Sequence, residues 1–391
     1  MTSPPTVPSR CDGVVCFAAV DWWYHNRGHS ECQIMRRLSG RAPVLWINSL
    51  GMRTPTPGKS DIVLRRYARK LASTIKGLRR DPSGMWVYSP LFVPRYSRRF
   101  AAINGFLVAQ QVALLTRCLG MKAPSVFVTN PTAAPAVGRG HWVRTIFNRS
   151  DDFTKFPEAN AAFVREMETM MFRLADATLY VNRGLFAREC ANVPDARYIG
   201  HGVDFSHFDR KRRVLEACPA EIRDLPRPIV GFYGGLRDYT VDLDLMIKTA
   251  RSLPTGTLLV IGPTAMEISP LLAEPNVAYL GPIQYERIPD YASQFDVGIM
   301  PWHENEWIRA CNPIKFKEYL ALGFPIVTTD FDQLGELRSL VYVSRSHDEF
   351  VGNVARALAE RDESLVQRRK ASVADDSWDQ VAETVAALLQ V

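Results

Sequence analysis

The 391-residue sequence contains no apolar run of the roughly 18 residues that a membrane-spanning helix needs. Its first ten residues also lack the apolar core of a secretory signal. The seven cysteines are scattered, and none shows the paired spacing of a zinc site. These absences predict a protein of the reducing cytoplasm, either soluble or peripheral to a membrane, without structural zinc.

Cofactor and metal motifs are missing as well. Gly234 and Gly235 follow an apolar run but do not form the GxGxxG pattern, so a nicotinamide or flavin site is not favoured. The triplet Asp242-Leu243-Asp244 has the form of a metal-binding DxD motif. The helical periodicity after it instead makes these acids the first turn of a helix. We therefore expect neither a bound cofactor nor a metal ion.

Basic residues are present in excess, and the net charge of +7 indicates an anionic partner. They gather with apolar and aromatic residues in the stretches 64–80 and 92–100. Such stretches can rest on an anionic membrane surface, and they can equally be solvated helix faces. No zinc-finger spacing or RNA-binding aromatic signature accompanies the charge, so nucleic acid is not an expected partner.

Short apolar runs recur along the chain, and helical stretches separate them. Strands that alternate with helices predict an α/β protein with parallel, doubly wound sheets. The length and the 47% hydrophobic content suffice for two domains. The expected strands are 14–20, 44–48, 126–129, 145–148, 177–181, 229–233, 258–261, 277–280, 297–300 and 324–327.

The most informative stretch is 312–329, NPIKFKEYLALGFPIVTT, which is typical of a helix followed by a buried strand. Asn312 is expected to cap the helix and Gly323 to end it. Lys315 and Glu318 share one face near the amino end, where free backbone N–H groups favour an anion. A nucleoside diphosphate would offer phosphates to Lys315 and ribose hydroxyls to Glu318. An ordinary surface ion pair is the alternative.

This stretch resembles the nucleotide-sugar segment of glycosyltransferases with the two-domain GT-B fold. The resemblance rests on Pro313, Lys315, Glu318, Tyr319, Leu320, Ala321, Gly323, Pro325, Ile326 and Val327. It implies that Lys315 binds the donor diphosphate and that Glu318 binds the ribose. It also implies two Rossmann-like, doubly wound parallel-sheet domains that face each other across a cleft.

We place the domain boundary in 205–228, a polar and charged stretch with three prolines that is typical of a linker. The expected organisation is an acceptor-side domain over 1–204, this linker, and a nucleotide-sugar domain over 229–375. The resemblance further implies a terminal helix within 376–391 that crosses back to the amino-terminal domain.

The segment 147–153, FNRSDDF, follows an expected strand, so its carboxylates should lie at the carboxyl edge of the sheet, where ligands bind. Asp151 is our first candidate for a general base that accepts the proton of an attacking hydroxyl. Asp152 is the second candidate, and it could instead cap a helix that begins near Pro157. The segment resembles the catalytic-base loop of bacterial polysaccharide glycosyltransferases, including the xanthan glucuronosyltransferase, which implies the base role for Asp151.

Four more residues are candidate contacts for the acceptor or the cleft. Arg27, His29 and Ser30 lie in the loop after the first strand, which opens toward the carboxyl edge of the sheet. His201 stands in a His-Gly-Val-Asp segment, and by resemblance such segments line the interdomain cleft. A structural loop histidine is the alternative for His201.

Further donor contacts are expected at the ends of two strands in the second domain. Backbone N–H groups at the pair Gly234-Gly235 can approach a phosphate, and Arg237 can add a bidentate clamp. Trp302 could contact the donor base or sugar, or it could be a core aromatic residue.

One position departs from the resembled family. Retaining members often carry two glutamates, the second of which matches Glu318, and Ala310 stands eight residues before it. Glu304 or Glu306 could substitute for the missing acid. Because a carboxylate base is available, we favour inversion by direct displacement, with the leaving diphosphate stabilised by cations and by the helix terminus.

Together these patterns predict a metal-independent, cytoplasmic glycosyltransferase for the synthesis of cell-surface polysaccharide or glycolipid. It would move a sugar from a nucleoside diphosphate to a glycan or lipid-linked acceptor, at or near the inner membrane face. Two alternatives are a nucleotide-sugar epimerase or hydrolase on the same fold, and a non-catalytic membrane-associated partner.

Overall fold

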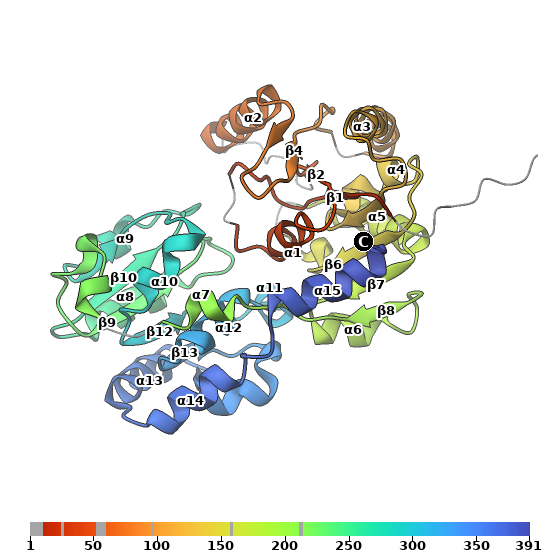
Figure 1. Cartoon of the computed structure of the whole chain (residues 1–391). Coiled ribbons are helices and arrows are strands. Elements are labelled where there is room, and N and C mark those ends of the chain that lie inside the picture. Colours follow the sequence, from red (N-terminus) through yellow and green to blue (C-terminus); the bar gives the residue numbers. More distant parts are fainter. Residues whose placement is uncertain (1–10, 25–26, 52–59, 96, 157–158, 211–213) are drawn as a thin grey trace, which may run out of the picture. The chain divides into compact units, whose positions relative to one another are not determined.

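The computed structural model describes residues 11–24, 27–51, 60–95, 97–156, 159–210 and 214–391. The chain forms two compact units, each with its own sheet and hydrophobic core (Figure 1). Unit 1 comprises Met1–Gly200 and Trp378–Val391, and unit 2 comprises His201–Ser377.

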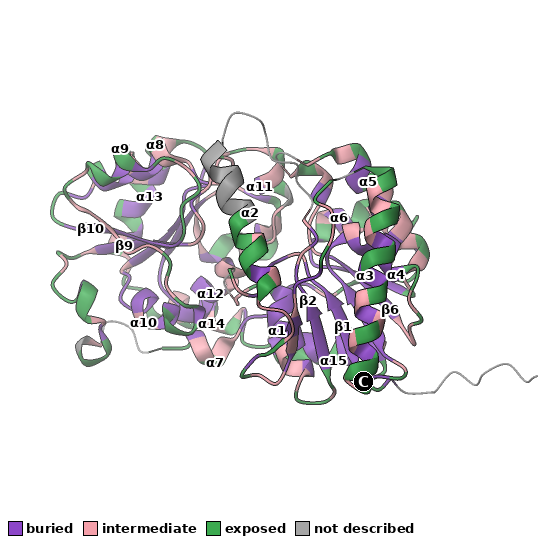
Figure 2. Ribbon diagram, turned by 90° about the horizontal axis from the view of Figure 1, so that it is seen from above, coloured by how far each residue is buried: buried purple, intermediate pink, exposed green. Residues whose placement is uncertain are grey.

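Unit 1 contains an eight-stranded sheet in the order β3-β4-β2-β1-β5-β6-β7-β8, parallel except at the β3–β4 pair. The central strands are buried on both faces because helices cover both sides, which explains their continuous apolar sequences (Figure 2). The strands are β1 Val14–Phe17, β2 Val44–Ile47, β3 Arg79–Arg80, β4 Trp86–Tyr88, β5 Ser125–Val128, β6 Thr145–Arg149, β7 Ala177–Tyr180 and β8 Ala196–Tyr198.

The helices of unit 1 include one from the far end of the chain. They are α1 Ser30–Leu38, α2 Ser60–Ile75, α3 Arg98–Cys118, α4 Ala134–Val137, α5 Ala161–Leu174, α6 Arg183–Glu189 and α15 Trp378–Leu389. Helix α15 packs against α1, and the Arg37 Nε donates to Asp379 at 2.8 Å. The Ser125 hydroxyl on β5 donates to the Leu389 carbonyl at 2.7 Å.

Unit 2 contains a fully parallel six-stranded sheet in the order β11-β10-β9-β12-β13-β14. Its strands are β9 Ile229–Tyr233, β10 Thr257–Ile261, β11 Val277–Tyr279, β12 Val297–Met300, β13 Ile326–Thr329 and β14 Tyr342–Ser344. Its α-helices are α7 Phe205–Phe208, α8 Leu243–Arg251, α9 Ser269–Leu272, α10 Ile288–Ala292, α11 Glu306–Ala310, α12 Ile314–Leu322, α13 His347–Ala359 and α14 Glu363–Ala371.

In both sheets the direction of strand addition reverses beside the first strand of the unit. In unit 1 the reversal lies between β1 and β5, and in unit 2 it lies between β9 and β12. Open α/β sheets bind ligands outside the carboxyl ends of the strands at such a point. The predicted α/β class with doubly wound parallel sheets is confirmed, and the topology directs attention to the loops after β9 and β12.

Several element boundaries differ from the sequence prediction. The strand predicted at 324–327 lies at β13, two residues later, because Gly323 ends α12 with φ +76° and Phe324 and Pro325 complete the turn. The helix predicted near Pro157, a residue outside the described ranges, begins at α5 with Asn160 as its cap. The described part of 205–228 belongs to unit 2 and contributes to its core, so it is more than a connecting segment; its buried residues there are Phe208, Cys218 and Ile222.

Candidate functional site

Unit 2 gathers most of the predicted donor residues at the carboxyl ends of β9 and β12. Gly234 follows β9, and Trp302 follows β12. The amino end of α12 brings Lys315 to the same place, with its Nζ 4.9 Å from the centroid of the Phe232 ring and 5.9 Å from that of Trp302. A cation therefore lies at the topological reversal of the sheet, where a ligand is expected.

The Lys315 ammonium lies directly against the backbone of the glycine loop. A Cβ atom at Gly234 would overlap the Lys315 Nζ, and the φ of Gly234 is +148°, a conformation that other residues rarely adopt. The loop after β10 is equally close, since a Cβ at Gly262, with φ +141°, would overlap the Gly234 carbonyl oxygen. Both positions require glycine because neither has space for a side chain. The Lys315 ammonium fills that space at Gly234, and the Gly234 backbone fills it at Gly262.

Burial changes the charge equilibrium of Lys315. Desolvation lowers its pKa to about 8, the Glu318 carboxylate opposes this shift, and the neighbouring Arg237 adds to it. A bound diphosphate would restore the ammonium, because a negative charge beside it favours the protonated form. Lys315 is therefore suited to holding an anion that arrives with a ligand.

Glu318 is buried, with 4% of its surface exposed, so it does not form the surface ion pair of the alternative interpretation. The Tyr233 hydroxyl donates to its Oε2 at 2.7 Å. Burial raises the pKa of Glu318 to about 7, while hydrogen bonds from Tyr233 and Tyr285 and the charge of Lys315 act in the opposite direction. A carboxyl group in this state is held in a fixed orientation beside Lys315.

The remaining predicted donor residues lie near this group or flank it. Arg237 donates to the Tyr239 hydroxyl at 3.1 Å, and Gly235 lies beside the Arg237 side chain. The predicted cap at Asn312 is wrong by one position, since α12 begins at Ile314 and its cap position is Pro313, which makes no side-chain cap bond. Asn312 thus lies one residue further from the helix end than predicted.

Two other predictions concern residues of unit 2. His201 is buried, and its carbonyl accepts a hydrogen bond from the Lys317 Nζ at 2.5 Å. Asp242 caps α8 by accepting from the Leu245 N–H at 2.9 Å, and it also bonds His347 at 2.8 Å. Among the described residues, no three side chains gather into a group that could hold a metal ion.

Unit 1 presents the predicted base in the loop after β6. The Asp151 carbonyl accepts a hydrogen bond from the Arg149 guanidinium at 2.8 Å, which fixes the backbone of this loop. Burial raises the pKa of Asp151 to about 7, and the carboxylate of Glu31 raises it further while Arg149 lowers it. A pKa near neutrality is the value that suits a general base.

The neighbouring Asp152 is engaged differently. The Thr154 hydroxyl donates to its carboxylate at 2.6 Å, and Arg149 and Arg188 each lie 3.7 Å from it. Within the described residues, no hydrogen bond or ion pair occupies the Asp151 carboxylate. Asp152 therefore has a structural role in the loop, and Asp151 is the carboxylate that is available for chemistry.

A buried ionic cluster around Arg149 contacts the loop that carries Asp151 and Asp152. Arg149 contacts Glu168 on α5 at 2.5 Å and Glu189 of α6 at 3.0 Å, and its side chain is 3% exposed. Burial raises the pKa of Glu168 to about 7. Removal of one partner would leave the others charged and buried, so the cluster is costly to break, and its Arg149 also bonds the Asp151 carbonyl.

The three predicted contacts in the loop after β1 have different environments. Ser30 is buried at the start of α1 and donates to the adjacent Glu31 at 3.3 Å. Arg27 lies 3.5 Å from Asp81 and 5.1 Å from the centroid of the Trp22 ring. His29 is exposed at the cap position of α1. Arg27 and Ser30 are thus held by neighbouring side chains, and His29 is the exposed residue of the three.

Sequence reasoning missed the residues that support the candidate groups. Glu168 carried a signal, because it shares the buried face of α5 with Val164, Met167 and Met171, where an acid needs a partner. Arg149 ends a buried strand, which is a second readable signal. No sequence signal indicated the role of Tyr233, since tyrosine is a common residue in strands.

Residues 227–360 match the family model described as Glycosyl transferases group 1. The chain is 24% identical over 251 residues to a putative teichuronic acid biosynthesis glycosyltransferase, TuaH, of Bacillus subtilis (strain 168). This match covers 61% of the chain, and it spans 62% of the length of that curated relative.

Solved structures resemble the whole chain. The sucrose-phosphate synthase from Thermosynechococcus elongatus superposes with a TM-score of 0.68 at 14% identity, over 96% of this chain and 98% of that one. Anabaena HepE, solved in complex with UDP and glucose, gives a TM-score of 0.64 at 13% identity, over 97% and 99% of the two chains. The resemblance predicted from the sequence is confirmed: residues 227–360 match the glycosyl transferases group 1 model, and the chain has the two-domain fold of GT-B glycosyltransferases.

Proposed function

We propose that this protein is a glycosyltransferase that uses a nucleoside diphosphate sugar as its donor. The observation that carries the proposal is the position of Lys315, whose ammonium lies against the Gly234 backbone at the strand-order reversal of unit 2. There the donor diphosphate would be bound by Lys315, by Arg237 and by backbone N–H groups at the amino end of α12. The adjacent Glu318 would accept hydrogen bonds from the ribose hydroxyls.

The proposed reaction is a direct displacement with inversion. Asp151 accepts the proton of the acceptor hydroxyl as its oxygen forms a bond to the anomeric carbon. The bond between that carbon and the diphosphate oxygen breaks at the same time, and the electron pair leaves with the nucleoside diphosphate. Lys315 and Arg237 stabilise the charge that develops on the leaving group. One carboxylate suffices for this route, in agreement with Ala310 at the position of the first of the two family glutamates.

The proposed substrates follow from the chemistry of the candidate groups and from the similar proteins. HepE was solved with UDP and glucose, which supports a uridine nucleotide sugar as the first donor to test. The name of the Bacillus subtilis relative refers to teichuronic acid biosynthesis, which supports a growing glycan or a lipid-linked sugar as the acceptor. We propose that the reaction proceeds in the cytoplasm, without a metal ion.

The test is transfer from a panel of labelled nucleoside diphosphate sugars to glycan and lipid-linked acceptors, in buffer that contains a metal chelator. We expect one donor to support transfer, and the Lys315→Ala variant to lose affinity for it. Turnover of the donor without any acceptor would instead support the epimerase or hydrolase alternative. Absence of binding to every nucleoside diphosphate in calorimetry would contradict the proposal and favour a non-catalytic partner.

A further inference from the structure

Helix α3 of unit 1 exposes a row of large apolar side chains along its outer face. Ile103, Phe106, Leu107 and Leu114 are 48%, 55%, 39% and 61% exposed. Leu91, which is 64% exposed, lies on the same side, because its backbone N–H and carbonyl both bond the Gln111 side chain. We call these five residues, with Arg99 and Arg117, the α3 surface. Exposed apolar patches of this kind mark interaction sites.

The orientation of α3 is fixed by the opposite face of the helix, so these side chains cannot turn inward. Gly105, Val108 and Val112 are buried on that face. A Cβ atom at Gly105 would meet the Cβ of Pro135 on α4 at 2.5 Å, so the two helices are in backbone contact. The exposed apolar residues of α3 follow Ile103 at i+3, i+4 and i+11, as expected for one face of an amphipathic helix.

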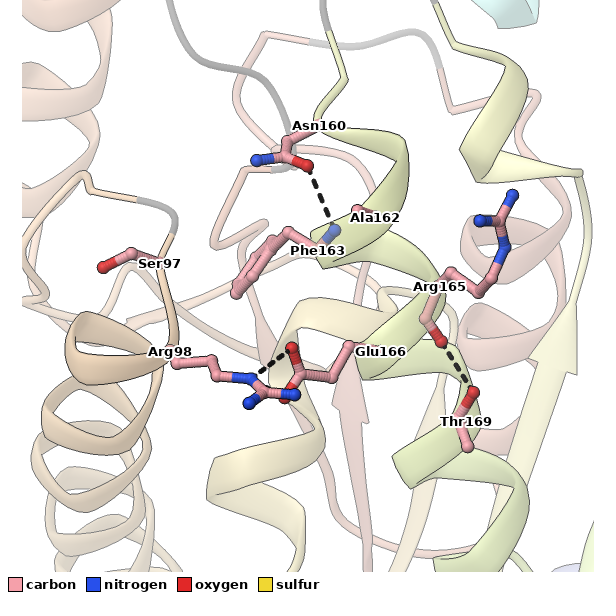
Figure 3. Close-up of a pocket in the computed structure, with 8 residues that line it drawn as sticks. All are labelled: Ser97, Arg98, Asn160, Ala162, Phe163, Arg165, Glu166 and Thr169. Carbon is pink, nitrogen blue, oxygen red and sulfur yellow. Dashed lines mark hydrogen bonds and ion pairs between the residues drawn. The ribbon is translucent and has the colours of Figure 1, made fainter.

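The charge on the α3 surface has one sign. The 21 residues of α3 include three arginines and no acidic residue. Arg98 is neutralised by Glu166 of α5, whose carboxylate accepts from its Nε at 2.7 Å across a hollow of about 520 Å³ (Figure 3). Arg99 and Arg117 form no ion pair among the described residues, and both are exposed at the ends of the apolar row.

A second hollow lies beside the carboxy-terminal half of α3. Its volume is about 480 Å³, and its floor is apolar, with Val112, Ala113 and Met121 among the lining residues. The cations Arg117, Lys122 and Arg139 also line it, and none of the described lining residues is acidic. Cations around an apolar floor complement an anionic amphiphile, whose chain is apolar and whose head group carries negative charge.

We propose that the α3 surface is the face by which this protein lies on an anionic lipid bilayer. Phe106, Leu107 and Leu114 enter the boundary between head groups and acyl chains, and Arg99 and Arg117 lie at the level of the lipid phosphates. This location differs from the stretches 64–80 and 92–100, since most of the surface lies beyond residue 100. The proposal does not depend on the proposed sugar transfer.

The proposal concerns binding to the surface of the bilayer. No helix among the described residues is long and apolar enough to cross a membrane. Binding by one apolar helix face with few cations is reversible, and it weakens as salt screens the charges. Reversible, salt-sensitive binding is therefore the behaviour to measure.

The test is flotation of the full chain with vesicles of phosphatidylcholine alone and with vesicles that also contain phosphatidylglycerol. We expect binding to the anionic vesicles only. The double variant Phe106→Ser/Leu114→Ser should weaken it at least about tenfold, since each side chain loses its apolar burial. Replacing Arg99 and Arg117 by glutamine should weaken it about fivefold for each arginine removed.

Matched controls separate the α3 surface from general effects. Leu272→Ser removes a side chain that is 46% exposed on α9 of unit 2, and Arg173→Gln removes an exposed arginine at the end of α5. Both controls should bind anionic vesicles like the unsubstituted protein, and all variants should keep its melting temperature.

Three results would overturn the proposal. The first is equal binding to neutral and anionic vesicles, or no binding to either. The second is unchanged binding by the Phe106→Ser/Leu114→Ser variant. The third is a dimer in vesicle-free solution that this variant converts to monomer, which would identify the α3 surface as an interface between two copies of the chain.

Discussion

The two units place opposite charges at the carboxyl edges of their sheets. In unit 1 a carboxylate, Asp151, is supported by the buried cluster around Arg149. In unit 2 an ammonium, Lys315, is supported by aromatic rings and by the close backbone of Gly234. The loop that carries the Asp151 carboxylate is thus held by ionic contacts, whereas the Lys315 ammonium is surrounded by aromatic rings and backbone.

Burial shifts the pKa values of both Asp151 and Lys315 toward neutral pH. It raises the pKa of Asp151 to about 7 and lowers that of Lys315 to about 8, because desolvation disfavours the charged form of each. Both groups therefore titrate near neutral pH, as catalytic groups often do. The comparison teaches that one physical cause can prepare both a proton acceptor and an anion-binding cation.

The largest expected effect is on the unit 1 side. Asp151→Asn should lower kcat by about 10² to 10⁴, because the amide cannot accept the acceptor proton. The affinity for a nucleoside diphosphate should stay within about twofold. The adjacent Asp152→Asn should reduce kcat far less, since its carboxylate already bonds Thr154. Equal losses in the two variants, measured by initial rates and calorimetry, would remove the distinction between these acids.

The corresponding change in unit 2 should affect binding. Lys315→Ala should weaken nucleoside diphosphate affinity about ten- to a hundredfold, as expected for loss of a hydrogen bond to a charged group. Lys248→Ala, in an exposed lysine of the same unit that pairs with Asp348, is the control and should leave affinity unchanged. Calorimetric titration of both variants checks the prediction, and an unaltered affinity in Lys315→Ala would contradict it.

The pH dependence should report both groups in one profile. Below about pH 7 Asp151 is protonated and cannot act as a base, so kcat/KM should fall about tenfold per unit of acidification. Above about pH 8 Lys315 becomes neutral, so kcat/KM should fall again. Lys315→Arg keeps the cation at high pH and should abolish the alkaline limb only. If the alkaline fall in kcat/KM persists in this variant, the titration of another group causes that fall.

The smallest effect concerns the two glycines after β9. Gly234→Ala should weaken donor binding several-fold and destabilise the fold by about 1–3 kcal/mol, because its φ of +148° is strained for alanine and its Cβ displaces the Lys315 ammonium. Gly235→Ala meets only the Arg237 Nε at 3.6 Å and is the matched control. Similar melting temperatures and affinities in the two variants would show that the close approach has no functional weight.

The buried strands were predictable because each is a short apolar run bounded by helical periodicity, whereas the short strands β3, β4, β8 and β14 were not predicted. The stop at Gly323 was readable too, since few residues other than glycine adopt a φ of +76°. The cap at Asn312 was misplaced because the prediction assigned Pro313 to the first helical turn, whereas it occupies the cap. Helix ends commonly shift by a residue in this way.

The candidate site was predictable only where a side chain follows a strand or begins a helix. Asp151, Lys315 and Gly234 satisfy this rule, and sequence position alone placed them at the edge of a sheet. The partners of Glu318 and Arg149 come from distant segments: Tyr233 is 85 residues away from Glu318, and Glu189 is 40 residues away from Arg149. Such pairings depend on tertiary packing, which no local pattern encodes.

The attachment of α15 to unit 1 has a consequence for synthesis on the ribosome. The sheet of unit 1 is bonded to the last turn of the chain, through the Ser125 hydroxyl and the Leu389 carbonyl. Unit 1 therefore cannot complete its fold until all of unit 2 has been translated. During that time the surface of unit 1 that binds α15 stays uncovered. Unit 2 is continuous in sequence and can therefore fold completely before unit 1 does. A chaperone that binds the nascent chain would then find unit 1, although it is synthesised first, still incompletely folded.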